Sequence, residues 1–332
     1  MVSRALLISL ISATAAHAYT IGSAFSDPCH ERITAAALGS VSIDLSDTDD
    51  RRPPILESER RLAGWLRERL GEASIEQPAA DERVLNSLLI GVRHPDVEGW
   101  QLRDLASIRS LQLDLDGQSA HFLRSDTDLD EAGNVSAAAK SRAYMLSLIE
   151  SSRISYELGG ELVNVPTWIE HYPDVTVPLV EAVYLLAQAL HALQDSFSHT
   201  YRGDDVAQVN VVLTYLGGFS PAWVERTSGP LHSSFLDQCT APENEKAVAA
   251  ATRASAELMA ATVEYWRTRD RRSVELVLER WLTVHAGCNL DNAYCGSPTF
   301  TLVEEKKRTG GCTEVPGGVL LLGAAWLLRR RR

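Results

Sequence analysis

The chain has 332 residues, of which 45% are hydrophobic and 23% are charged, so it can form one large globular domain or two modest ones. Its formal net charge of −12 leaves no obvious basic footprint for a polyanion, and no stable nucleic-acid partner is expected. Proteolytic processing is expected at both ends of the chain and would remove residues 1–18 and 313–332, which contain five arginines and one glutamate. The formal net charge of the processed chain would then be −16.

The N-terminus predicts a secretory signal peptide over residues 1–18. Arg4 precedes an apolar run over 5–15, and residues 16–18, Ala-His-Ala, form a small-x-small cleavage site. A buried first helix is the alternative reading. The chain is therefore expected to be exported, and its mature form to begin at Tyr19.

Between the two ends, hydrophobic periodicity predicts helices rather than strands. The first helix follows Ser26-Asp27-Pro28 and runs through His30 to Leu38. Further helices are predicted over 57–70, 81–92, 105–113, 136–158, 178–202, 243–268 and 273–286. The intervening segments 40–55, 114–135, 160–177 and 203–241 are polar or rich in Gly and Pro, and no run alternates with period two. The prediction is a single compact all-α domain over residues 19–300.

The helix predicted over 178–202 organises this domain. His191, Asp195 and His199 are four residues apart, so they share one stripe of an otherwise apolar helix. Buried polar groups without partners cost several kcal/mol, and a metal ion is the simplest shared partner. A hydrogen-bonded or solvated helix face is the alternative. We therefore expect a central metal-binding helix.

Residues 301–311 read as a polar linker to a C-terminal tail over 312–332. In the tail, Cys312 is followed by an apolar stretch over 315–328 and then by four arginines. Residues 315–328 are only 14 residues, which is shorter than an apolar helix normally needs to span a bilayer. The order of these features resembles the MYXO-CTERM sorting tail, which implies processing near Cys312 and attachment at the cell surface. A simple tail anchor is the alternative.

The four remaining cysteines are an even number in an exported chain, which indicates disulfides. Cys288 and Cys295 enclose a short loop and should pair locally, which leaves Cys29 to pair with Cys239. The sequence has no Cys-x-x-Cys motif, so thiolate zinc sites are not expected.

Five short motifs, in this order along the chain, resemble those of the zinc-dependent phospholipase C superfamily, which includes zinc-dependent single-strand nucleases. The likeness spans nearly the whole mature domain. The motifs are Tyr19 followed by His30; His94-Pro95-Asp96; Ala120-His121-Phe122 followed by Asp126 and Asp128; Leu190-His191 with Asp195 and then His199; and His232 with Asp237.

The resemblance implies a cluster of two or three zinc ions, with Asp195 bridging two of them. Imidazole and carboxylate ligands without thiolate suit zinc held for catalysis. The implied ligands are Asp96, His121, His191 and Asp195 for one zinc; the Tyr19 amine and carbonyl, His30 and Asp195 for a second; and His199, His232 and Asp237 for a third.

Two spacings depart from the family pattern. His199 follows Asp195 by four residues where six is common, although other branches have the shorter spacing. Asp237 follows His232 by five residues, whereas the family pair is usually one helical turn apart. Glu243 or Glu245 could substitute for Asp237 at the third zinc.

The other histidines and one acidic run match no ligand motif. His94, His171 and His285 are expected on the surface or in loop packing. The run from Asp126 to Asp130 could bind calcium, but its glycine is misplaced for an EF-hand loop, so a solvated acidic loop is favoured.

The resemblance implies a secreted or surface-attached phosphoester hydrolase, most similar to phospholipase C, that acts on a phospholipid or another phosphodiester. Asp96 could also orient or deprotonate the attacking water. A nuclease of the same fold and a non-catalytic zinc-binding surface protein are the alternatives. The acidic charge weighs against a polyanionic substrate, and the tail favours work near a membrane. The sequence does not indicate an oligomeric state.

Overall fold

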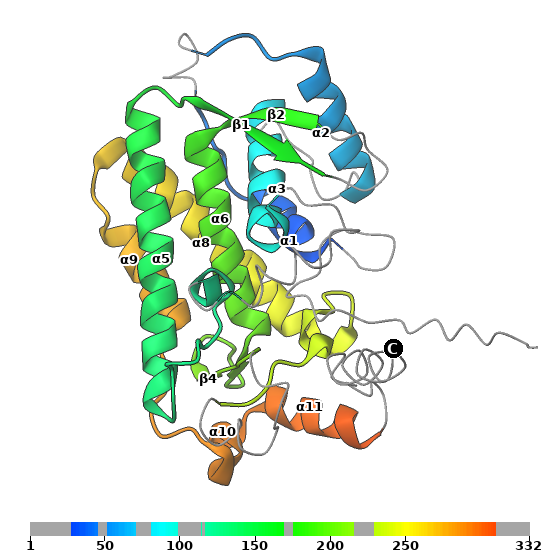
Figure 1. The fold of residues 1–332 in the computed structure, drawn as a ribbon, viewed down its shortest axis with the longest axis vertical. Helices are drawn as coiled ribbons and strands as arrows, with labels where there is room; N and C mark the ends of the chain where they lie inside the picture. The colour runs from blue at the N-terminus through cyan, green and yellow to red at the C-terminus, as the bar shows by residue number, and fades with distance from the viewer. Residues whose placement is uncertain are drawn as a thin grey trace, which may run out of the picture.

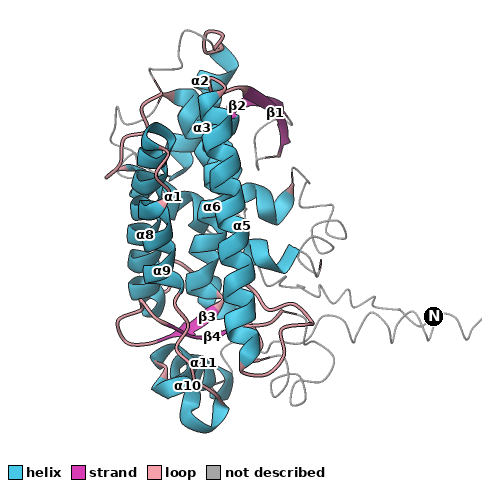
Figure 2. Cartoon of the chain, turned by 90° about the vertical axis from the view of Figure 1, so that its left-hand side faces the viewer, coloured by secondary structure: helices cyan, strands magenta, loops and turns pink. Residues whose placement is uncertain are grey.

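The computed structural model describes residues 28–45, 52–70, 81–98, 114, 117–168, 175–215 and 229–309. Within these residues the fold is mostly helical, with two small two-stranded sheets at opposite ends of the helical body (Figures 1 and 2). The predicted signal peptide, the helix predicted over 105–113 and the predicted sorting tail lie outside the described residues.

The helical elements agree broadly with the predicted ones. The α-helices are α1 (Cys29–Leu38), α2 (Glu57–Leu70), α3 (Glu82–Val97), α5 (Ala132–Glu157), α6 (Glu181–Ser198), α8 (Glu245–Thr268), α9 (Arg272–Leu282), α10 (Ala293–Gly296) and α11 (Pro298–Arg308). The 3-10 helices are η3 (Gly117–His121), η4 (Ser234–Asp237), η5 (Pro242–Asn244) and η6 (Leu290–Asn292).

Helix α3 is longer than predicted, and the added turn carries Asp96. The Asp81 side chain accepts a hydrogen bond from Val84 N and caps the helix N-terminus. Pro95 lies in the last turn, where its missing N–H costs a single backbone hydrogen bond. The helix therefore passes the predicted end at Val92.

The strands were not predicted from the sequence. Strand β1 (Leu162–Thr167) pairs antiparallel with β2 (Val175–Val180), and β3 (Thr200–Arg202) pairs antiparallel with β4 (Val209–Val212). Every residue of β3 and β4 is buried, so neither strand has the alternation that marks a half-exposed strand. Helix α6 is therefore shorter than the helix predicted over 178–202, because β2 and β3 occupy its two ends.

Helix α6 is almost entirely enclosed by the fold, and 15 of its 18 residues are buried. It packs against α3, α5 and α8, and Figure 2 shows it between α5 and α8. All residues from Ala189 to Ser198 are buried. Polar side chains in this stretch are therefore surrounded by protein on every side, and each needs a partner there.

Helix α3 crosses α6 closely at Gly91, and this crossing sets the distance between the helices that carry Asp96 and His191. A Cβ atom on residue 91 would lie 2.6 Å from Ala187 Cβ and 2.8 Å from Tyr184 O. Gly91→Ala is expected to lower the free energy of unfolding by about 1–3 kcal/mol.

Helix propensity alone favours alanine over glycine by about 1 kcal/mol. At residue 91 this gain is opposed by the clash of the added Cβ atom with α6. Gly64→Ala in α2 is the matched control, because a Cβ there has no atom within 4 Å. We expect urea denaturation to show Gly64→Ala neutral or stabilised. Equal stabilisation of both variants would contradict the close crossing.

The end of the domain differs from the prediction. The segment predicted as a polar linker begins inside α11, in which Val303 is buried and Lys306 Nζ lies 2.8 Å from Glu243 Oε1. The packed domain thus continues to Arg308 instead of ending near residue 300. No helix among the described residues has the length and apolar character needed to cross a membrane.

Candidate metal centre

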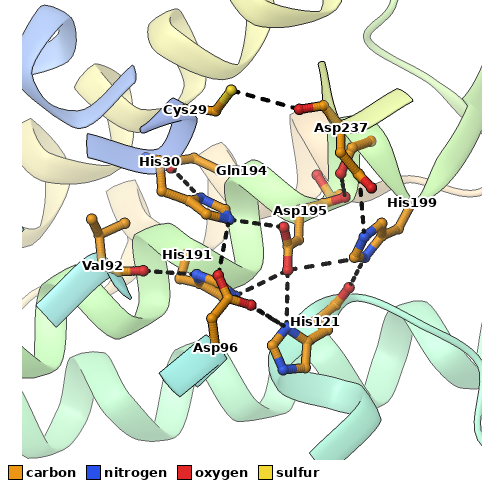
Figure 3. A network of polar contacts seen from close by, with 12 residues as sticks. Cys29, His30, Val92, Asp96, His121, His191, Gln194, Asp195, His199 and Asp237 are labelled. Atoms are coloured by element: carbon orange, nitrogen blue, oxygen red, sulfur yellow. Dashed lines mark hydrogen bonds and ion pairs between the residues drawn. The ribbon is translucent and has the colours of Figure 1, made fainter. Parts of the chain in front are cut away.

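Five buried side chains from four elements meet around Asp195 (Figure 3). They are His30 from α1, Asp96 from α3, His121 from η3, and His191 and Asp195 from α6. Asp195 Oδ2 lies 3.0 Å from His191 Nε2 and 3.2 Å from His121 Nδ1. Asp195 Oδ1 lies 3.2 Å from His30 Nε2. The Asp96 oxygens lie 3.7–3.9 Å from the nearest nitrogens of the three imidazoles.

Hydrogen bonds to the outward-facing nitrogens orient the imidazole rings. His30 Nδ1 lies 2.8 Å from Gln194 Oε1, and His191 Nδ1 lies 2.7 Å from Val92 O. Since these oxygens only accept, each Nδ1 carries the proton and donates it. In the neutral ring each Nε2 then has its lone pair directed into the cluster, as in a histidine that ligates a metal.

A second buried group adjoins the first at the end of α6. His199, the C-cap residue of α6, donates from Nδ1 to the carbonyl oxygen of His121, which leaves its Nε2 facing Asp237. Asp237 Oδ1 lies 3.8 Å from His199 Nε2 and 3.0 Å from His232 Nε2. These three residues form one set of possible metal ligands.

The five-residue spacing between His232 and Asp237 is compatible with this group because the segment is not α-helical. The backbone is extended at Ser233 and then turns through η4, which ends at Asp237. Asp237 is fully buried, whereas Glu243 and Glu245 are exposed and Glu243 pairs with Lys306. Asp237 is therefore the carboxylate of this group, and the substitutes suggested by the sequence are not needed.

The first disulfide joins the chain segments that carry the two groups. Cys29, next to His30, is bonded to Cys239, two residues after Asp237, with a Cα–Cα distance of 5.7 Å. Cys288 and Cys295 form the other disulfide. Both are the pairs expected from the sequence, and they indicate that the chain folds in an oxidising compartment.

Buried charge is poorly compensated in this region. Neither oxygen of Asp96 has a hydrogen-bond partner, and Asp237 Oδ2 has none. No lysine or arginine among the described residues pairs with Asp96, Asp195 or Asp237. Buried carboxylates of this kind ordinarily pair with a cation or coordinate a metal.

The pKa shifts have the same physical origin. Burial, and then the nearby charges of Asp195 and Asp96, raise the pKa of Asp237 well above its usual value. Burial opposes ionisation of Asp195, but the four surrounding imidazoles, those of His191, His199, His30 and His121, hold its pKa well below the usual range. Burial lowers the pKa of His30, but the Asp195 and Asp96 carboxylates outweigh this effect and raise it to about 9. The buried carboxylates thus favour positive charge on the groups around them, as they would favour a bound cation.

The remaining tyrosine and histidine positions considered in the sequence contribute no described side chain to either buried group. Tyr19 and His171 lie outside the described residues. His94 packs edge-on against Tyr184, with ring centroids 5.4 Å apart, and burial followed by the charge of His191 lowers its pKa to about 4. His285 is exposed. The expected surface or packing roles therefore fit His94 and His285.

One carboxylate of the acidic run after His121, that of Asp128, is bonded to other groups of the protein. Asp128 accepts hydrogen bonds from Ser125, Ser136 and Lys140, and Lys140 Nζ lies 2.7 Å from Asp128 Oδ1. These bonds and the Lys140 charge hold the pKa of Asp128 below its usual value despite burial. Asp126 and Asp130 are exposed, as expected for a solvated acidic loop, whereas Asp128 is buried and paired with Lys140 and so departs from that expectation.

Comparison of the chain with protein-family models, curated proteins and solved structures found no match. The fold and site therefore define the class: a mostly helical, disulfide-bonded domain with buried His/Asp groups that could hold metal ions.

The sequence analysis did not identify Gln194 as part of the site. Its side chain bonds to His30, and its Nε2 donates to Thr34 Oγ1 at 2.9 Å and Ser255 Oγ at 3.2 Å. The available signal was a glutamine next to Asp195 in an apolar helix, where a buried amide needs several partners.

Gln194→Leu is expected to weaken metal binding by about 10–100-fold, because His30 loses the acceptor that fixes its ring. Competition with a chromogenic chelator measures this affinity. Gln188→Leu, on the same helix but outside both groups, is the control and should bind metal normally. Unchanged affinity in Gln194→Leu would show that His30 is not a ligand.

Proposed function

We propose that this protein is an exported, zinc-dependent phosphoester hydrolase, most similar in its site to phospholipase C. The observation that carries the proposal is the convergence of five histidines and three aspartates in adjacent buried groups, where Asp96 and Asp237 keep carboxylate oxygens without a hydrogen-bond partner. A single structural zinc needs about four ligands, and eight exceed that requirement.

The donor atoms suit zinc, because neutral imidazole nitrogens and carboxylate oxygens are common ligands of catalytic zinc. His121, His191, Asp96 and Asp195 would hold one ion, and His199, His232 and Asp237 another. His30, with Asp195 and the Tyr19 amine and carbonyl, would hold a third. Bound zinc would lower the pKa of a water molecule and offset the charge of the phosphate oxygens.

Asp96 is the best candidate for proton transfer among the side chains of the site. Its two oxygens lack hydrogen-bond partners, and it is fully buried. A carboxylate oxygen with a free lone pair can orient a nucleophilic water and accept its proton. The imidazoles of His30 and His191 are held by Gln194 and the Val92 carbonyl, so the site is preorganised.

A lipid phosphodiester is favoured over a nucleic acid as the substrate. The net charge of −12 opposes binding of a polyanion, whereas it opposes a single phosphodiester much less. The resemblance of residues 312–332 to a sorting tail would place the domain at the membrane surface, close to such a substrate.

The test is hydrolysis by the mature domain of a chromogenic phosphodiester and of phosphatidylcholine vesicles, before and after zinc removal with a chelator. We expect both substrates to be cleaved, activity to vanish with zinc, and added zinc to restore it. Faster cleavage of single-stranded DNA than of lipid would favour the nuclease alternative. A zinc-loaded protein that cleaves none of the three would be a non-catalytic binding protein.

A further inference from the structure

The second disulfide and one exposed histidine form a group that shares no residue with the buried groups. The sulfurs of Cys288 and Cys295 and a ring nitrogen of His285 all lie within 4.8 Å of one another. Cys288 is buried, whereas Cys295 and His285 are exposed. While the sulfurs are bonded to each other they cannot act as thiolate ligands.

The loop that carries both cysteines is held by bonds other than the disulfide. The Asn292 side chain accepts from Asn289 N at 3.0 Å and from Cys295 N at 2.8 Å. Its amide nitrogen donates to Gly287 O at 2.7 Å. Because one side chain gathers three backbone groups, the cysteines stay near each other even when the S–S bond is open.

Strand β4 anchors the loop and the histidine to the domain. His285 N donates to Val209 O at 2.8 Å, and Asn210 Nδ2 donates to Tyr294 O at 2.9 Å. Tyr294 directly precedes Cys295 and is only 4% exposed, so its side chain holds this part of the loop against the core. Val209 and Asn210 are adjacent in β4, which places His285 and Cys295 on one rigid support.

The backbone before Cys295 is in a conformation that non-glycine residues avoid. Ala293, Tyr294 and Cys295 have φ values of 49°, 51° and 59°. Left-handed helical backbone costs roughly 1–2 kcal/mol per residue, and disulfides in exposed or strained segments are the more easily reduced ones. In the other disulfide Cys29 is fully buried and Cys239 is partly buried, whereas Cys295 is exposed, so a reductant should reach Cys295 first.

We propose that reduction of the Cys288–Cys295 disulfide turns this loop into a site for a thiophilic cation, Zn²⁺ or Cu⁺, held by the two thiolates and His285. A protein dithiol of the thiol–disulfide oxidoreductase class supplies two electrons and two protons. The S–S bond opens to two thiols, and the dithiol becomes a disulfide. Cation binding then releases the two thiol protons. Two sulfur ligands with one imidazole suit these ions.

The site could not be inferred from the sequence because its ligands lack a familiar spacing. A Cys-x-x-Cys motif is absent, and Cys295 follows Cys288 by seven positions. The left-handed turn and the Asn292 bonds bring together groups that a regular helix or strand would keep apart.

The test uses the mature chain with Cys312→Ser, so that the tail contributes no thiol. The protein is reduced with a phosphine, its free thiols are counted, and it is titrated with Co²⁺ as a spectroscopic probe. We expect a thiolate-to-cobalt charge-transfer band that saturates at one Co²⁺ per chain after reduction and is absent before it. The buried groups contain only imidazole and carboxylate, so Co²⁺ bound there gives no such band.

Two variants identify the residues that hold the cation. Cys288→Ser with Cys295→Ser should abolish the band, and His285→Ala should keep both thiols but bind Co²⁺ roughly tenfold more weakly or worse, which is about 1.4 kcal/mol or more. Two free thiols in the reduced protein without a band would overturn the proposal. A band that survives in the double variant would overturn it as well, because the thiolates would then be those of Cys29 and Cys239.

Discussion

Replacing Asp195 with asparagine is expected to remove at least two metal ions from the protein. Asp195 Oδ2 faces His121 and His191, and its Oδ1 faces His30, so the two oxygens point toward different parts of the site (Figure 3). A carboxylate in this position can bridge two cations and screen their mutual repulsion. Asparagine has nearly the same shape but no charge, so the neighbouring ions lose their shared anion.

Metal analysis after gel filtration gives the number of bound ions per chain. Asp237→Asn is the matched control, because Asp237 belongs to one ligand group and should lose one ion. Asp291→Asn, on the exposed loop, should lose none. Loss of only one ion from Asp195→Asn would show that Asp195 binds a single metal ion and does not bridge two.

The same substitution separates effects on metal binding from effects on folding. In metal-free protein, four imidazoles compensate the buried Asp195 charge, and two other carboxylates lie nearby. Removing one negative charge from this group relieves repulsion between carboxylates but weakens the pairing with imidazole, so the stability of the metal-free protein should change little. Because Asp195→Asn binds fewer zinc ions, zinc should raise its unfolding temperature much less than that of the native protein.

Removing the Cys29–Cys239 disulfide should cause the largest loss of stability. It closes a loop with a sequence separation of 210, and the loop-entropy relation gives about 5 kcal/mol for a loop of that length. The Cys288–Cys295 disulfide, with a separation of 7, gives about 2 kcal/mol by the same relation. Urea denaturation of the two Cys-to-Ser double variants compares these values directly.

The long-range disulfide should also affect the metal site. His30 follows Cys29, and Asp237 lies two residues before Cys239, so the bond keeps α1 next to η4. Cys29→Ser with Cys239→Ser should bind the ion near His199 more weakly, whereas Cys288→Ser with Cys295→Ser should not. Similar stability losses in both variants, with intact metal binding, would show that the first disulfide does not organise the site.

Local patterns were enough to predict the elements that carry most of the site. The four-residue spacing of His191, Asp195 and His199 depends only on helix geometry, so it predicted which side chains share a face. Helix α2 has the predicted bounds because its apolar stripe and its flanking glycine are local signals. The cysteine pairing followed from an even number of cysteines and one short loop.

The rest was decided by contacts between distant parts of the chain. Strands β3 and β4 are buried on all sides and pair across a loop, so neither alternation nor length marked them in the sequence. Asp237 meets His232 through a 3-10 turn rather than an α-helix. Gln194 acquires its role from His30, 164 residues away. A sequence pattern reports how neighbouring side chains are placed, but tertiary packing determines which distant donors, acceptors and charges become their partners.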